Sequence, residues 1–138
     1  MSSMYVDVVS ATESLYSGEA KCVFAPASTG ELGIYPKHMA LLSVLKPGEV
    51  RIETESGIHS IYVSGGVVEV QPDAVTIFSD TAIRANDLDE SKALEAKQRA
   101  EEAMANAEGE KDISATQAAL AESMAQLQMI SKMRGKKI

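Results

Sequence analysis

The amino-acid pattern of this 138-residue chain changes once, near Asp87, and this change constrains the fold more than any other feature. Before that point, apolar and polar residues alternate in short runs that Gly and Pro interrupt. After it, Ala, Glu, Lys and Gln dominate, and apolar residues recur at helical spacing. Because one element type cannot satisfy both periods, the sequence predicts two parts, residues 1–86 and 87–138.

The first part has the pattern of short β-strands. Val50 and Ile52 alternate with charged neighbours, and β-branched runs follow over residues 61–64, 67–70 and 75–78. Such side chains fit a pleated, half-buried surface, and short strands with turn signals between them are typical of a sandwich or barrel. Only residues 39–45 are ambiguous. We therefore expect an α+β protein that begins with an all-β sandwich.

The second part predicts two helices. Asp87 and Glu90 have the spacing of a capping box, with Asp in place of Ser or Thr. Ala then recurs at helical spacing as far as Ala107, and Gly109 can adopt a positive φ that ends the helix.

A second helix is expected to start at a cap formed by Asp112 or Ser114. Its apolar residues fall on two adjoining faces, one with Ile113, Leu120, Met124 and Leu127, the other with Ala118, Ala121, Ala125 and Met129. The short polar loop before it predicts an antiparallel two-helix hairpin. Ala-rich helices bury little apolar surface, so we expect this hairpin to depend on neighbouring surfaces and to change conformation with them.

Charge and composition exclude several functional classes. The formal net charge of −7 argues against binding to nucleic acid or directly to anionic lipid. The single cysteine, Cys22, rules out an internal disulfide and indicates a reducing compartment. No secretory signal and no apolar run of about 20 residues is visible, so membrane attachment is expected only through partners.

Motifs for catalysis or metal binding are not found. His38 and His59 have no Cys or His at ligand spacing, and Gly65-Gly66 fits a hairpin turn better than a phosphate-binding loop. Cys22 lies in an apolar stretch and is interpreted as a small buried hydrophobe. The sequence therefore favours a non-catalytic protein.

Several stretches, taken in register, match one known family: Asp7-Val8-Val9-Ser10, residues 30–36, Lys46-Pro47-Gly48, residues 62–70, Asp80-Thr81-Ala82-Ile83-Arg84 and residues 88–93. Together they resemble the epsilon subunit of the bacterial F-type ATP synthase over essentially the whole chain. The resemblance implies a non-catalytic central-stalk subunit that couples rotation to ATP synthesis and inhibits ATP hydrolysis through its C-terminal helices. It also implies a peripheral location at the cytoplasmic face of the bacterial inner membrane.

The resemblance further implies partners and contact residues. The sandwich would contact the gamma subunit and the loops of the c-ring, with Glu31 and His38 on the c-ring side. The alternative for Glu31 is a solvated side chain in a tight turn over residues 30–33. In the extended state, the alpha and beta subunits would receive the basic end of the second helix: Lys132, Arg134, Lys136 and Lys137. The alternative interpretation is that these cations complement the helix dipole and contact no partner.

Some relatives bind regulatory ATP through a motif that reads here Leu88-Asp89-Glu90-Ser91-Lys92-Ala93, with Lys where Arg is usual. Asp89, Lys92 and Arg99 would contact the nucleotide, although an exposed first-turn pair of Asp89 and Lys92 is the favoured interpretation.

A second departure concerns residues 36–40, where the family usually has Gly at the position of Lys37 and Pro at that of Ala40. The rival hypothesis to a stalk subunit is a free-standing ligand-binding β domain whose helices dimerise.

Overall fold

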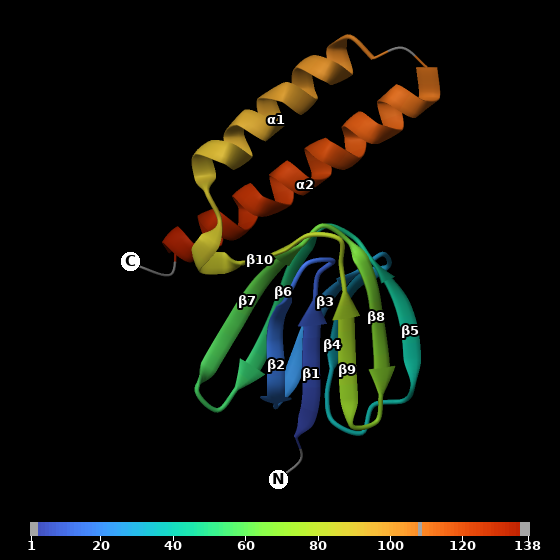
Figure 1. The fold of residues 1–138 in the computed structure, drawn as a ribbon, viewed down its shortest axis with the longest axis vertical. Coiled ribbons are helices and arrows are strands. Elements are labelled where there is room, and N and C mark those ends of the chain that lie inside the picture. Colours follow the sequence, from blue (N-terminus) through green and yellow to red (C-terminus); the bar gives the residue numbers. More distant parts are fainter. Residues whose placement is uncertain (1–2, 108, 136–138) are drawn as a thin grey trace. The chain divides into compact units, whose positions relative to one another are not determined.

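The computed structural model describes residues 3–107 and 109–135, and it divides the chain into two compact units, residues 1–86 and 87–138. Each unit has its own secondary structure, β in the first and α in the second (Figure 1). The expected fold class, a β-sandwich followed by two helices, is confirmed.

The first unit is built from short strands. Along the chain they are β1 (Met4–Val9), β2 (Ser14–Ala20), β3 (Cys22–Ala27), β4 (Gly30–Ile34), β5 (Leu41–Leu45), β6 (Gly48–Thr54), β7 (Gly57–Val63), β8 (Gly66–Gln71), β9 (Ala74–Phe78) and β10 (Ala82–Arg84). A 3-10 turn, η1 (Ala85–Asp87), follows. The β-branched runs lie in β7, β8 and β9, as the alternation predicted, and the ambiguous segment contains β5.

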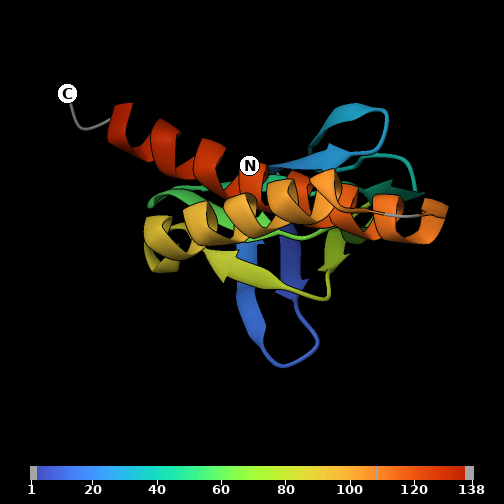
Figure 2. The same ribbon diagram turned by 90° about the horizontal axis from the view of Figure 1, so that it is seen from above.

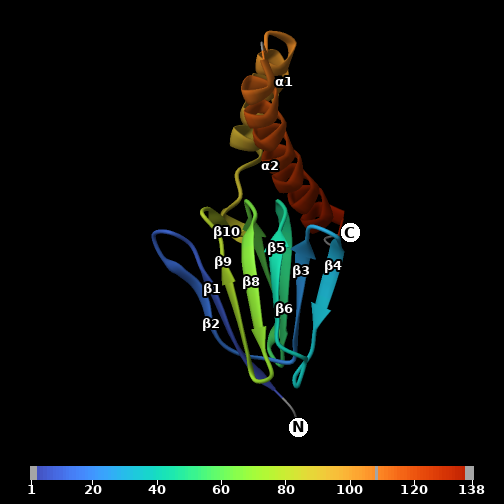
Figure 3. The ribbon, with the colours of Figure 1, turned by 90° about the vertical axis from the view of Figure 1, so that its right-hand side faces the viewer.

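The strands pair in the order β10-β7-β6-β3-β5-β8-β9-β1-β2, and β4 is added to β3. All these pairs are antiparallel except β1 with β9. A single residue pair, Ala27 with Leu45, joins β3 to β5 where the sheet bends from one layer to the other. Figure 3 shows β3 and β4 at one side of the sandwich and β1 and β2 at the other.

The two layers enclose one apolar core. Inward side chains alternate with outward ones along β1, β6, β8 and β9, so each strand buries every second residue. The buried cluster includes Val6, Val8, Ile34, Val50, Ile52, Ile61, Val68, Val70 and Ile77. This core lies entirely within the first unit.

The second unit contains the helices α1 (Glu90–Ala105) and α2 (Gly109–Gly135), which run side by side in opposite directions (Figure 2). The N-cap of α1 is Asp89, so the expected cap at Asp87 is wrong. Asp89 has extended backbone angles, and its carboxylate accepts a hydrogen bond from the Lys92 N–H at 3.2 Å. Asp87 belongs to η1 instead, and a cap must have an extended backbone to reach the free N–H groups.

The start of α2 also differs from the prediction. Gly109 has a φ of 83°, as expected, but α2 begins at this residue rather than after Asp112 or Ser114. Glu110 and Asp112 then lie in its first turn, where acidic groups complement the helix dipole. The predicted apolar faces are partly wrong, because Ile113 and Met124 are exposed, whereas Ala125 and Met129 are buried.

The interface between the two helices is thinly packed. A groove of about 400 Å³ runs between them, lined by Ala96, Arg99, Ala100, Ala103, Ala115, Thr116 and Ala119. On α1 the buried residues are only Ala93 and Ala100, and Leu94 is 44% exposed. Alanine contributes little apolar area, so this interface stabilises the hairpin weakly.

Glu122 on α2 should make the stability of the helices depend on pH. Burial raises the pKa of its carboxyl group above the ordinary value of 4.5. Folding then favours the protonated form, so its contribution to stability is present below pH 4.5 and is lost as the pH rises through the raised pKa. We expect Glu122→Gln to increase the thermal stability of the helical signal at neutral pH, and the gain to vanish in acid.

The measurement is circular dichroism at 222 nm on the full chain, melted at a series of pH values. Glu101→Gln is the matched control, since Glu101 is an exposed carboxylate on α1. A gain of equal size for Glu122→Gln at every pH would contradict the prediction.

Candidate functional site

The outward face of β5, β8 and β9 carries apolar side chains, although a solvent-facing antiparallel sheet normally carries polar ones. Val44 on β5 pairs with Val67 on β8, and Val67 pairs with Phe78 on β9. Their exposed fractions are 60%, 39% and 53%, and Leu42 on the same face of β5 is 68% exposed. We call these four residues the apolar row. A contiguous exposed apolar surface is typical of a protein-protein contact.

Glu31 lies on β4, in register with Pro26 on β3. The alternative interpretation of residues 30–33 as a tight turn is therefore wrong, because this segment is a strand and the turn precedes it. Glu31 is exposed, and both of its carboxylate oxygens accept hydrogen bonds from the Arg51 guanidinium, at 3.2 and 3.3 Å. No motif in the sequence points to Arg51, which is 20 residues from Glu31 along the chain.

His38 lies in the loop between β4 and β5, beyond the opposite end of β4 from Glu31. Its backbone N–H donates to the Tyr35 carbonyl at 3.2 Å, and its Nδ1 lies 2.9 Å from the Met39 carbonyl oxygen. The structure therefore does not bring the two residues predicted for the c-ring side together on one strand end. A role for either in binding stays a prediction.

The same loop holds Lys37 in the left-handed region, with a φ of 67°. Its N–H donates to the Pro72 carbonyl at 2.8 Å, which ties the loop to the turn between β8 and β9. A residue with a Cβ is strained in this conformation, and glycine is not. A glycine at this position would therefore relieve the strain.

Lys37→Gly should stabilise the first unit. Relief of the left-handed strain exceeds the greater entropy of the unfolded glycine, for a net gain of about 0.5–1 kcal/mol and a Tm rise of about 2–6 °C. Thermal unfolding of the full chain measures this change. Lys37→Ala is the control, since it removes the charge but keeps the Cβ. An equal rise for both variants would attribute the effect to charge instead.

Asp89 is the N-cap of α1, and Lys92 and Arg99 lie on this helix. The Asp89 carboxylate is used as the helix cap, and the Lys92 side chain is exposed in the first turn. Arg99 lies two turns after Lys92, on the same side of the helix, and lines the groove between α1 and α2. These contacts favour the structural interpretation of Asp89, and ATP binding by the three residues stays a prediction.

The predicted basic end lies partly outside the described residues. Lys132 is exposed on α2, and Arg134 falls within the helix. Lys136 and Lys137 lie outside the described residues, so the proposed contact with the catalytic head stays a prediction.

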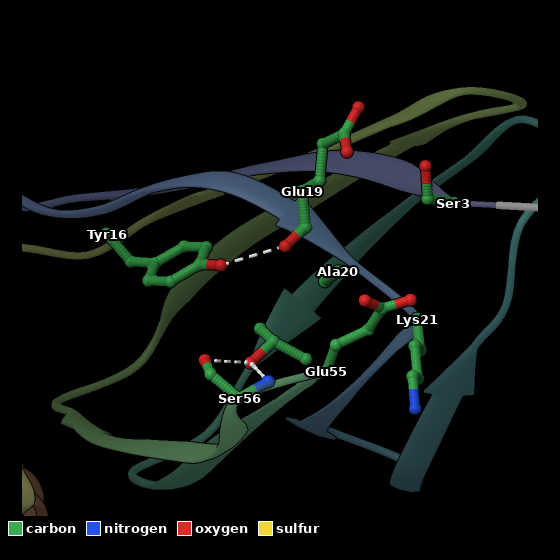
Figure 4. A pocket seen from close by; sticks show the side chains of 8 residues that line it. Ser3, Tyr16, Glu19, Ala20, Lys21, Glu55 and Ser56 are labelled. Carbon is green, nitrogen blue, oxygen red and sulfur yellow. Dashed lines mark hydrogen bonds between the residues drawn. The ribbon is translucent and has the colours of Figure 1, made fainter.

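A cleft of about 810 Å³ opens beside β2 and the turn between β6 and β7, lined by Ser3, Tyr16, Glu19, Ala20, Lys21, Thr54, Glu55 and Ser56 (Figure 4). The Tyr16 hydroxyl donates to the Glu19 carbonyl at 2.9 Å, and burial raises the pKa of this phenol. The hydroxyls of Thr54 and Ser56 lie 3.0 Å apart. None of these lining groups pairs a nucleophile with a base, so the cleft does not suggest catalysis.

Cys22 is 6% exposed, which confirms that it is a small buried residue. Its thiol donates to the Glu53 carboxylate at 3.4 Å. Burial of the thiol is the main cause of its raised pKa of about 11, and the neighbouring Glu53 carboxylate is the second cause. A neutral thiol is a poor nucleophile. Among the residues that the structure describes, no three potential metal ligands gather, and no helix has the length and hydropathy of a membrane span.

Comparison with known proteins identifies the family. Residues 3–85 match the family model described as "ATP synthase, Delta/Epsilon chain, beta-sandwich domain", and residues 86–131 match the corresponding "long alpha-helix domain". An ATP synthase epsilon chain of Vesicomyosocius okutanii subsp. Calyptogena okutanii is 82% identical, over 99% of both chains. That of Ruthia magnifica subsp. Calyptogena magnifica is 78% identical, over 100% of both.

Solved structures share the fold. A chain in the mitochondrial ATP synthase of Euglena gracilis, solved with OSCP, F1 and c-ring, superposes with a TM-score of 0.81 at 19% identity, covering 93% of this chain and 81% of that one. A chain from the central stalk and c-ring of the Tetrahymena thermophila enzyme gives 0.69 at 18% identity, covering 92% and 96%. From both family models and from relatives of such high identity, we conclude that this chain belongs to the epsilon-subunit family of the F-type ATP synthase and is a non-catalytic subunit of that complex.

Proposed function

We propose that this chain is a rotor subunit of the central stalk, which couples rotation to ATP synthesis and restrains ATP hydrolysis through its helices. The apolar row is the observation that supports this proposal most strongly. A chain that acted alone would expose Leu42, Val44, Val67 and Phe78 to water, whereas a chain that functions inside a complex can bury them against a partner.

The gamma subunit is the partner that we assign to the apolar row. The row crosses three strands of a well-packed layer, so it presents a preformed surface that needs no reorganisation on docking. The Tetrahymena structural relative belongs to a central stalk with a c-ring, which is consistent with an obligate position in such a stalk. Glu31 would then contact the c-ring loops.

The helical hairpin is proposed as the regulatory part. Its interface of small side chains and its open groove favour a hairpin that can exchange its own contacts for those of another surface. In the extended state, its basic end would dock on acidic surface of the alpha and beta subunits. The complex as a whole would hold the chain at the cytoplasmic face of the bacterial inner membrane.

Co-purification tests this proposal. A tagged chain in its native cell is expected to bring down the gamma, alpha and beta subunits in constant ratio. A self-contained homodimer free of ATP synthase subunits would instead support the rival hypothesis of an independent β domain.

A further inference from the structure

We propose that Arg51 is a positioning residue that holds the Glu31 carboxylate in the orientation in which it contacts the c-ring. This inference rests on the proposed function, because it takes Glu31 as the contacting group. Arg51, Phe24 and Gly33 belong to three different strands and together form one support for Glu31.

The support begins with strand register. On the outward face, Phe24 on β3 lies between Arg51 on β6 and Gly33 on β4, and it is in register with both residues. A Cβ added at Gly33 would approach the Phe24 ring to 3.2 Å, closer than ordinary contact. Because Gly33 has no side chain, the Phe24 ring can pack against β4 at this position. The Tyr35 ring meets Phe24 edge-on, with centroids 6.2 Å apart.

Arg51 lies on this aromatic ring. Its guanidinium carbon is 4.8 Å from the Phe24 ring centroid, which is a cation–π distance. From there, Nη1 and Nη2 donate to Oε2 and Oε1 of Glu31 as a two-pronged fork. Nη1 is also 3.8 Å from a Glu49 carboxylate oxygen. Lysine could supply the charge, but neither the stacking plane nor the fork.

The Glu31 side chain is 53% exposed, so without Arg51 it would occupy several rotamers. Fixing one flexible side chain before docking improves affinity by about two- to ten-fold. Each carboxylate oxygen keeps a lone pair that can accept from a partner. Two carboxylates around one guanidinium also leave one net negative charge, which suits an N–H donor or a cation on the c-ring loop.

The experiment uses membranes that carry the assembled ATP synthase and measures protons pumped per ATP hydrolysed. Glu31→Gln and Arg51→Met are each expected to lower this ratio by about two- to ten-fold, and the double variant no further. Arg51→Lys should lie between Arg51→Met and the unmodified chain, and it also serves if Arg51→Met does not fold. Lys21→Met, which removes the same charge just before β3 and away from Glu31, is the control and should change nothing.

A charge exchange separates positioning from a purely structural role. Glu31→Arg combined with Arg51→Glu restores an ion pair between the same strands, so the Tm of the full chain should recover. The pumping ratio should stay low, because the group facing the c-ring now has the wrong charge.

Recovery of both quantities would overturn the positioning role, and so would an unchanged ratio in Arg51→Met and Arg51→Lys when Glu31→Gln lowers it. An unchanged ratio in Glu31→Gln would instead overturn the c-ring contact of the proposed function.

Discussion

Deletion of residues 88–138 is expected to raise the ATPase rate of the assembled complex several-fold, while the remaining sandwich stays folded and bound. The buried cluster of the first unit lies wholly between Met4 and Ile77, so the deletion removes none of its members. The apolar row also remains. The expected gain follows from the proposed role of the helices, which can block rotation only if they are present.

The measurement compares ATP hydrolysis by complexes with intact and shortened chains, at matched amounts of incorporated chain. A shorter deletion, of residues 132–138, removes only the basic end. It should release part of the inhibition at low salt and none at high salt, where docking through charge is already screened.

An unchanged rate after the long deletion would contradict the inhibitory role. Loss of cooperative unfolding in residues 1–87 would contradict an independent sandwich.

Val44→Lys should abolish stable docking of the chain on the complex. Val44 is 60% exposed in the free chain, and it lies beside Val67 within the apolar row. Docking would bury the new ammonium group without a partner and would lose the apolar contact of the valine. Together these effects cost about 3 kcal/mol or more, which weakens the affinity about 100-fold or more.

Binding to a complex of the alpha, beta and gamma subunits measures this effect. Ile58→Lys is the matched control, because Ile58 is 56% exposed on β7 and lies outside the apolar row. Both variants should keep the Tm of the unmodified chain, since both side chains point outward. Equal affinity of Val44→Lys and the unmodified chain would show that gamma binds elsewhere.

The two halves of the fold could be predicted because their signals are local. Alternation along β6 and β8 is visible within a few residues, and so is the alanine repeat of α1. Side-chain period is fixed by the geometry of a single strand or helix, so it does not depend on distant neighbours. The family resemblance was likewise readable from short stretches in register, and the comparisons confirm it.

The cap of α1 was predicted at the wrong residue, Asp87, because local spacing does not show the backbone conformation. Asp87 and Asp89 both precede α1, and only the backbone decides which is extended. The strained backbone of Lys37 could not be predicted from the sequence either, because the hydrogen bond to the distant Pro72 carbonyl helps to set its φ angle.

The sequence alone thus determined the fold class, the absence of catalytic motifs and the family. Only the tertiary structure assembled the apolar row from β5, β8 and β9, and the Arg51–Glu31 pair from β6 and β4. In a sequence, apolar residues that point outward alternate in the same way as those that point inward. Only the position of the second layer shows which face of the strand is covered. Contacts between strands depend on register, which is decided by the packing of the whole sandwich rather than by any short segment.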